Sequence, residues 1–359
     1  MPQETPPAPQ PACRPARLSY GQLQDRPLQP FTRLPSARSQ EKAMHVLILG
    51  ATGFIGSHIT ASLLAAGHTV CAAARSGGSG RPAADGLAYA TWDGKNPDGL
   101  RPLLEHADAV INLQGENIGA ARWTRARKQA IVQSRLDAGY ALVTALHELR
   151  HKNQRLPQCL LQASACGYYG LWPDAATAPP CTEHSPAGQG FLARTCVQWE
   201  ASTAPVEDMG IRRCILRFSP VLGKKSSGAA GGFLERMLPP FRYFMGGPVG
   251  SGHQPVSWIH MEDVTRIALF LLAQSGLCGT FNASAPETVS MRRFAHTLGS
   301  VCARPVWLPV PASLVRLALG EMAEELILCG QNPFPSRLAD AGYAFRYGSL
   351  EQALADTLA

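Results

Sequence analysis

The fold is decided by one stretch, His45-Val46-Leu47-Ile48-Leu49-Gly50-Ala51-Thr52-Gly53-Phe54-Ile55-Gly56, in which an apolar run passes into three glycines at three-residue intervals. The run predicts a buried strand, and the residues through Leu64 predict a helix. One glycine permits a tight turn, one lets the backbone approach a pyrophosphate, and one allows close packing of helix on strand. The helix start adds unpaired N–H groups and a partial positive charge. The predicted dinucleotide-binding residues are Gly50, Thr52, Gly53, Phe54, Ile55 and Gly56.

Apolar runs and helical patterns alternate through the first half of the chain. Strands are expected near residues 45–50, 69–74, 87–91, 108–113, 158–164 and 211–217. Helices are expected near residues 54–66, 121–149 and 191–209. This alternation predicts an α/β fold, a doubly wound Rossmann-type parallel sheet with helices on both faces.

The alternation loosens after Arg217 into a stretch rich in glycine and proline, from Gly228 to Gly252. A strand is expected at Val256–Ile259, with helices near 262–275, 290–302, 312–329 and 348–358. We therefore expect a Rossmann domain at 44–225, to which later segments return. A smaller, mostly helical lobe with a helical extension is expected at 226–359. Such a lobe would cover the carboxyl ends of the strands, where doubly wound sheets bind ligands.

Residues 1–43 contain nine prolines and no periodic apolar pattern. Such a segment buries too little surface to offset its ordering entropy, so a disordered, proline-rich tail is expected. It also lacks the apolar region of a secretory signal.

The composition excludes several classes of protein. Hydrophobic residues make up 45% of the 359 residues and charged residues 16%, and no apolar run approaches the ~20 residues of a membrane span. The net charge of +7 includes no basic run, so neither nucleic acid nor a membrane is an expected partner. The ten cysteines form no C-x-x-C pair, which predicts no metal site and a reducing cytoplasm. We expect a monomer or homodimer that takes a small-molecule substrate.

The residue after the second expected strand indicates which dinucleotide binds. An NAD-specific protein would place a carboxylate there for the ribose 2′-hydroxyl, but this chain has Arg75. A guanidinium pairs with a 2′-phosphate through charge-assisted hydrogen bonds, so Arg75 predicts NADP(H). Asp93, after the third strand, is expected either to hold the adenine amine or to form a turn.

Several motifs together resemble the extended short-chain dehydrogenase/reductase superfamily, in its epimerase/dehydratase branch. The general motifs are Gly50 to Gly56, Asn112-Leu113-Gln114-Gly115, Ser164 before Gly167-Tyr168-Tyr169-Gly170, and Trp258-Ile259-His260-Met261-Glu262-Asp263. More specific stretches resemble the YfcH-like subgroup of epimerase family proteins: Glu116-Asn117-Ile118, Arg122-Trp123-Thr124, Lys128, Trp199-Glu200 and Gly320-Glu321-Met322-Ala323. The resemblance covers residues 44 to 359.

The resemblance implies further site residues. Asn112, Leu113 and Gly115 would line the cofactor site, and Arg135 would contact a cofactor phosphate or lie exposed on its helix. Ser164 would hydrogen-bond a reacting carbonyl or, alternatively, bond the backbone at its strand end. Tyr168 and Tyr169 would reach the nicotinamide side of the cleft or simply pack.

The superfamily's hydride chemistry uses Tyr-x-x-x-Lys on the helix after the fifth strand, where the phenol exchanges a proton with the substrate. Phe191 and Thr195 occupy those positions here. Two hypotheses follow. The chain is either an NADP-dependent oxidoreductase or epimerase-like enzyme without the tyrosine, or a non-catalytic NADP(H)-binding sensor or regulator.

Overall fold

The computed structural model describes residues 43–75, 84–225 and 227–359. The tail expected at 1–43 lies outside these ranges except for its last residue. No helix within them combines the length and the apolarity that crossing a membrane requires.

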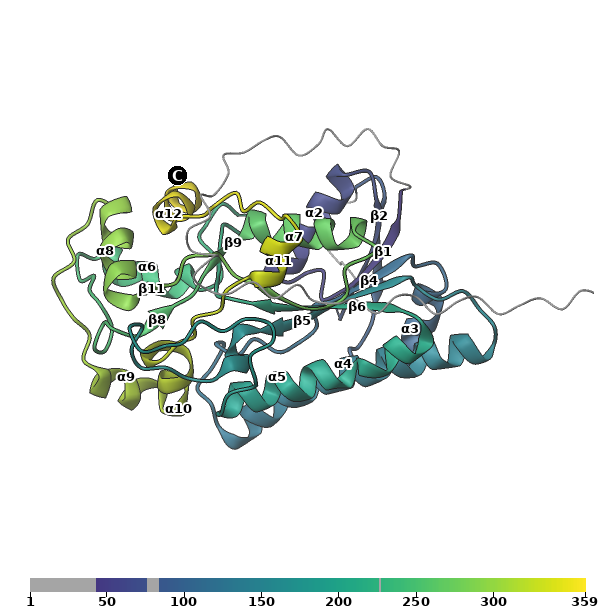
Figure 1. Cartoon of the computed structure of the whole chain (residues 1–359), viewed down its shortest axis with the longest axis horizontal. Coiled ribbons are helices and arrows are strands. Elements are labelled where there is room, and N and C mark those ends of the chain that lie inside the picture. The colour runs from purple at the N-terminus through teal and green to yellow at the C-terminus, as the bar shows by residue number, and fades with distance from the viewer. Residues whose placement is uncertain (1–42, 76–83, 226) are drawn as a thin grey trace, which may run out of the picture. The chain divides into compact units, whose positions relative to one another are not determined.

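A seven-stranded parallel sheet forms the centre of the described fold (Figure 1). Its strands are β1 (His45–Leu49), β2 (Thr69–Ala74), β3 (Leu87–Thr91), β4 (Ala109–Asn112), β5 (Cys159–Ala165), β6 (Arg212–Phe218) and β10 (Gly279–Ala283). Their order is β10-β6-β5-β4-β1-β2-β3, so the strand order reverses between the neighbouring parallel strands β1 and β4. The doubly wound parallel sheet is therefore confirmed, and β10 is a strand that the sequence did not predict.

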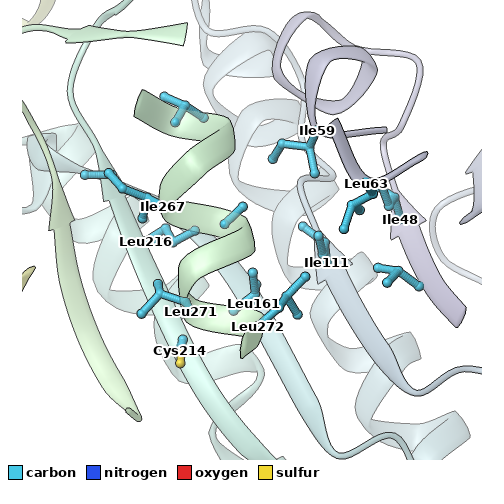
Figure 2. Close-up of a cluster of buried hydrophobic side chains, with 14 of the residues drawn as sticks. Ile48, Ile59, Leu63, Ile111, Leu161, Cys214, Leu216, Ile267, Leu271 and Leu272 are labelled. Atoms are coloured by element: carbon cyan, nitrogen blue, oxygen red, sulfur yellow. The ribbon is translucent and has the colours of Figure 1, made fainter. Parts of the chain in front are cut away.

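Helices cover both faces of the sheet (Figure 1). On one face, α2 (Phe54–Ala65) and α7 (Met261–Ala273) bury Ile59, Leu63, Ile267 and Leu271 against the strands (Figure 2). On the other face lie α3 (Pro97–Leu104), α4 (Arg125–His151) and α5 (Phe191–Ser202). Together with β10, α7 is a late segment of the chain that returns to the Rossmann sheet.

A second core lies in the C-terminal half, around the buried Trp258, Phe241 and Phe294. It is built by α6 (Leu234–Arg242), α8 (Met291–Val301) and α12 (Leu350–Leu358). Two short strand pairs also belong to this half of the chain. They are β7 (Val221–Leu222) with β9 (Ile259–His260), and β8 (Pro255–Val256) with β11 (Val289–Ser290).

The C-terminal extension contains further short helices. They are α9 (Ala312–Leu319), α10 (Glu321–Ala323), a π-helical turn (Glu324–Leu328) and α11 (Ser336–Asp340). The single helix expected over 312–329 is broken at Gly320, whose φ of +61° leaves the helical region. The helix expected at 191–209 ends at Ser202, and a 3-10 turn (Ala204–Met209) follows. A second 3-10 turn (Cys166–Tyr169) follows β5.

The start of α7 anchors the end of the chain. The buried Asp263 carboxylate accepts hydrogen bonds from the backbone amides of Arg346 (2.8 Å) and Tyr347 (3.0 Å). His260 is the N-cap of α7, where its Nδ1 accepts from the Glu262 amide at 3.3 Å. Its Nε2 lies 3.3 Å from the Asp356 carboxylate of α12. His260 therefore caps the start of α7.

Burial lowers the pKa of His260 from its usual 6.5 to about 4, although Asp356 opposes this shift. Because the unfolded chain binds the proton more readily, this histidine stabilises the fold above pH 6.5 and loses that contribution as the pH falls toward 4. The loss amounts to about 3 kcal/mol of unfolding free energy. A His260→Asn variant keeps a capping side chain but has no group that titrates there. We expect its unfolding free energy, measured by urea titration, to fall less steeply over this range than that of the wild type. Equal slopes would contradict the assignment.

Candidate functional site

The loop between β1 and α2 is packed too closely for side chains at two of its glycines. Gly50 has a φ of +83°, and a Cβ there would lie 3.1 Å from the Leu113 carbonyl carbon at the end of β4. A Cβ on Gly56 would lie 2.4 Å from the Gly50 carbonyl oxygen. The glycines therefore bring the helix start and the β4 turn against the loop, at the point where the strand order reverses.

The N-terminus of α2 offers an electropositive surface. Its N-cap is Gly53, which has no side chain to occupy the first amides, and its first turn has no acidic residue. Thr52, Phe54 and Ile55 are partly buried around it. The Phe54 ring packs against the glycine-rich segment, where a Cβ on Gly231 would come within 2.5 Å of it. Such a helix start is suited to binding an anion.

An open pocket of about 240 Å³ lies beside this loop. Its lining residues come from the ends of β2 and β3, the turn after β4 and one side of α4: Arg75, Asp93, Gly94, Lys95, Gln114, Gly115, Glu116, Ala130, Gln133, Ser134 and Asp137. The structure thus brings the predicted Arg75, Asp93 and Gly115 together at one pocket.

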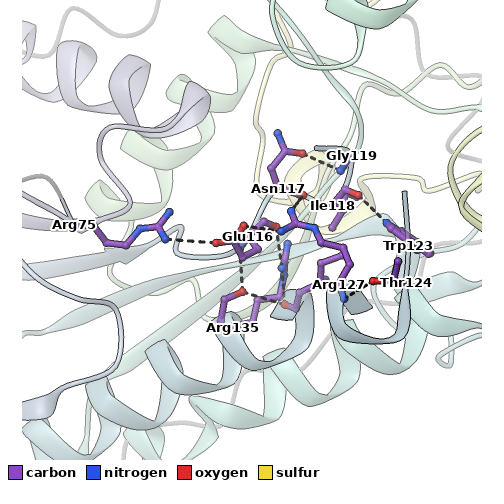
Figure 3. A network of polar contacts seen from close by, with 11 residues as sticks. Arg75, Glu116, Asn117, Ile118, Gly119, Trp123, Thr124, Arg127 and Arg135 are labelled. Atoms are coloured by element: carbon purple, nitrogen blue, oxygen red, sulfur yellow. Dashed lines mark hydrogen bonds and ion pairs between the residues drawn. The ribbon is translucent and has the colours of Figure 1, made fainter. Parts of the chain in front are cut away.

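A carboxylate stands between two arginines at this pocket (Figure 3). Glu116 lies 3.5 Å from the guanidinium of Arg75 and 3.1 Å from that of Arg127. Arg127 also donates to the Asn117 carbonyl at 2.5 Å, which holds the turn after β4 to the start of α4. Arg75 is 72% exposed, so its guanidinium is free to exchange Glu116 for another anion.

Two predicted cofactor residues, Asp93 and Asn112, make internal contacts. Asp93 forms a turn: the amides of Lys95 and Asn96 donate to its carboxylate and lower its pKa. Asn112 is fully buried and donates to Gln162 at 3.0 Å, while its side-chain oxygen accepts from the Gln114 amide at 3.2 Å and so shapes the turn at Leu113. Any direct contact of these side chains with a cofactor stays a prediction.

The Arg135 side chain, on α4, packs under the turn after β4 and hydrogen-bonds to it. Its guanidinium donates to the carbonyls of Ile131 (2.8 Å) and Glu116 (3.2 Å) and stacks over the Trp199 ring. Burial lowers its pKa to about 10. The exposed orientation that the sequence allowed is not the one observed, and a phosphate contact stays a prediction.

Ser164 and Tyr169 belong to a buried polar network. The Ser164 hydroxyl, 2% exposed, donates to Glu200 at 2.6 Å. Glu200 accepts two hydrogen bonds from Arg217, each 2.8 Å long. Arg217 donates in turn to the Tyr169 hydroxyl at 3.0 Å, and that hydroxyl donates to Asn282 at 2.7 Å. A hydroxyl has a single proton, so both groups use theirs inside the protein.

The two tyrosines after β5 differ in their surroundings. Burial raises the pKa of the Tyr169 phenol well above its usual value, so it is held as a neutral hydrogen-bonding group. Tyr168 is only partly buried, and the Arg217 guanidinium lies 3.4 Å from the centre of its ring. Of the three predicted catalytic residues, Tyr168 is therefore the least enclosed.

Phe191 and Thr195 occupy the first turns of α5. The Thr195 hydroxyl donates to the Phe191 carbonyl at 2.8 Å and is almost wholly buried. The Phe191 ring meets Trp123 edge to face at 4.9 Å between centroids, and Lys128 Nζ lies 5.0 Å from its centre.

Sequence reasoning missed the partners that the fold brings to these residues. Glu200 and Arg217 lie on separate elements, and only Trp199-Glu200 had been noted as a motif. Lys128 pairs with Glu321, which is 193 residues away in the chain. Within the described ranges, no group of three or more His, Cys, Asp or Glu side chains is placed to hold a metal ion.

The parallel sheet and glycine loop define a protein of the Rossmann class. The model of the NAD dependent epimerase/dehydratase family matches residues 46–283, and that of a domain of unknown function, DUF1731, matches residues 310–357. The chain belongs to the NAD dependent epimerase/dehydratase family.

The similarity to its relatives extends over nearly the whole length of those proteins. Epimerase family protein YfhF of Bacillus subtilis is 35% identical over 319 residues, covering 88% of this chain and 98% of YfhF. Epimerase family protein SDR39U1 of Homo sapiens is 32% identical over 319 residues, covering 88% of this chain and all of that protein. A crystal structure of human SDR39U1 (isoform 2) with NADPH superposes with a TM-score of 0.75 at 30% identity, covering 88% of this chain and 99% of that one. The expected family and the YfcH-like epimerase subgroup are therefore confirmed.

Restoring the superfamily's pair should fail here. Thr195 is 4% exposed, so the ammonium in Phe191→Tyr/Thr195→Lys would be buried without a partner. We expect the double variant to lose about 3–5 kcal/mol of unfolding free energy and to gain no NADPH-dependent turnover. Phe191→Tyr alone is the matched control and should cost less, because its hydroxyl adds no charge. Denaturant titration and an NADPH-oxidation assay measure both. A stable double variant with raised turnover would refute this prediction.

Proposed function

We propose that this chain binds NADP(H) and uses it as an oxidoreductase or epimerase-like enzyme on a small molecule. The observation that carries the proposal is the close backbone packing at Gly50 and Gly56, which sets the start of α2 against the turn after β4, whose residues line the pocket beside Arg75. A Cβ at either glycine would meet the protein's own backbone, so both glycines are needed for the compact loop that would present the first amides of α2 to a pyrophosphate. The human relative crystallised with NADPH supports the same choice of cofactor.

Each part of the site would hold one part of the cofactor. The first amides of α2 would bind the pyrophosphate. Arg75 would leave Glu116 and pair with the 2′-phosphate, while the pocket lined by Asp93, Gln133 and Asp137 would take the adenosine. Bound NADPH would supply a hydride to a substrate beyond β4 and β5. The chain's own task there is to orient the substrate, exclude water and provide a proton.

The setting of this activity follows from the rest of the chain. We propose that the protein works in a reducing cytoplasm, which is supported by the nine cysteines of the described ranges, all of which are free thiols. The proposed partner is a small-molecule substrate, and the proposed assembly is a monomer or homodimer.

A non-catalytic NADP(H) sensor is the second candidate. The observation in its favour is that Ser164 and Tyr169 spend their protons internally while Phe191 has none to give. Incubation of the protein with NADPH and a panel of aldehydes, ketones and quinones separates the two. Sustained NADPH oxidation at a rate proportional to the protein concentration supports the enzyme hypothesis. NADPH binding without any turnover supports the sensor.

Arg75 and Glu116 should have opposite effects on cofactor choice. Arg75→Ala should weaken NADPH binding by about 1–3 kcal/mol, the range for a hydrogen bond to a charged group, and leave NADH unchanged. Glu116→Gln should tighten NADPH by up to about 1 kcal/mol, because it removes a carboxylate that repels the phosphate and competes for Arg75.

Fluorescence titration with NADPH and NADH measures both variants, and NADH is the internal control. Equal changes for the two cofactors would show that neither residue reads the 2′-phosphate. No NADPH binding by the wild type would refute the proposed function itself.

A further inference from the structure

Lys128 is a cation placed beside the ring of Phe191. It lies in the first turn of α4 and is 30% exposed. Its ammonium contacts both carboxylate oxygens of Glu321, at 2.8 and 3.0 Å, and lies 5.0 Å from the centre of the Phe191 ring. An ammonium has three N–H donors, and the two carboxylate oxygens of Glu321 accept from two of them. Among the described residues Lys128 has no other hydrogen-bond acceptor, so one donor is left for a ligand.

The topology brings this ammonium to the edge of the sheet where ligands bind. α4 follows β4 and α5 follows β5, so both helices begin at the carboxyl ends of neighbouring parallel strands. Lys128 and Phe191 stand at these two helix starts. The pocket proposed for the adenosine is lined by the residues of α4 that follow Lys128, from Ala130 to Asp137.

The C-terminal extension holds both helix starts in place. Glu321 of the extension pairs with Lys128. Glu325, one turn later, accepts from the backbone amides of Phe191 (2.5 Å) and Leu192 (2.9 Å) at the start of α5. Two carboxylates of one short segment thus fix the position of Lys128 relative to Phe191, and α10 has a structural reason to lie at the site.

Three hydroxyl groups at this edge of the sheet are already committed. Ser164 donates to Glu200, Thr195 donates to the Phe191 carbonyl, and the Tyr169 hydroxyl donates to Asn282. The Lys128 ammonium carries protons that it can donate, whereas the Phe191 ring has none to give.

We propose that Lys128 is the proton donor of the reaction and that Glu321 is its positioning residue. The proposal rests on the proposed function. The carbonyl carbon accepts a hydride from the cofactor, the C=O π electrons move to oxygen, and that oxygen takes a proton from Lys128 Nζ. The products are an alcohol, the oxidised cofactor and a neutral amine, which regains a proton from water. In the reverse direction the neutral amine accepts the proton of the alcohol.

The first test separates charge from proton donation. Arginine keeps the charge and the pairing with Glu321 but does not give up a proton in proteins, while methionine keeps only the apolar stem. With phenanthrenequinone and diacetyl as carbonyl probes, Lys128→Arg and Lys128→Met should both lower kcat by about 10²–10⁴-fold. Their NADPH Kd should stay within twofold of the wild type. Lys152→Met, at the other end of α4, is the matched control and should keep full activity.

Glu321→Gln tests the positioning residue. It should lower kcat by a smaller factor than Lys128→Met while KM for the probe holds. In the double variant Glu321→Gln/Lys128→Met, kcat should fall no further than in Lys128→Met alone. Full activity in Lys128→Arg or Lys128→Met, or additive losses in the double variant, would overturn the proposal.

A second readout needs no turnover. Acetic anhydride labels free amines, and mass spectrometry measures the acetylation of each lysine in the full chain. NADPH should protect Lys128 several-fold and leave Lys152 unprotected, and Glu321→Gln should speed the labelling of Lys128. If NADPH binds in the fluorescence titration but protects neither lysine, this proposal falls and the proposed function stands. If the wild type binds no NADPH, the proposed function falls as well.

Discussion

The buried pairing of Arg217 with Glu200 is the interaction on which the carboxyl edge of the sheet depends. A charge out of water is costly unless it is paired and all its donors find acceptors. Arg217 on β6 meets this condition through Glu200 on α5 and through Tyr169, and each partner recruits a further group, Ser164 or Asn282. The network therefore fixes β5, β6, β10 and α5 relative to one another. It also explains why two residues that resemble catalytic groups are turned inward.

The C-terminal extension completes this edge from outside. Its carboxylates meet the start of α5 through Glu325 and Lys128 through Glu321, and its last segments are held by Asp263 on α7. The extension also pairs with the segment after β5, where Trp172 bridges to Gly330. Because it touches both halves of the fold at the site, it behaves as a part of the site and not as an appendage.

The two ends of the site obey different constraints. At the proposed cofactor end the backbone itself forms the loop, so glycine is required and the requirement is visible in the sequence. At the proposed reaction end, around Phe191 and Lys128, the surface is made by side chains from distant segments. A residue missing from one element can therefore be compensated by a residue of another. Phe191 has no proton to donate. The ammonium beside it belongs to Lys128 of α4, and Glu321 of the C-terminal extension holds that ammonium in place.

The sequence by itself determined the Rossmann sheet, the cofactor loop and the identity of Arg75 as the residue after β2, because these follow from local periodicity and from glycines adjacent in the chain. It did not predict β10, whose five residues show no signal apart from their place beside β6. It also missed α3 and α6, which both contain proline inside the helix. Only the tertiary structure decided that Ser164 and Tyr169 face a buried ion pair and that Lys128 meets Glu321. Such contacts join residues far apart in sequence, and their free energy depends on burial and on the satisfaction of every polar group, which no local pattern encodes.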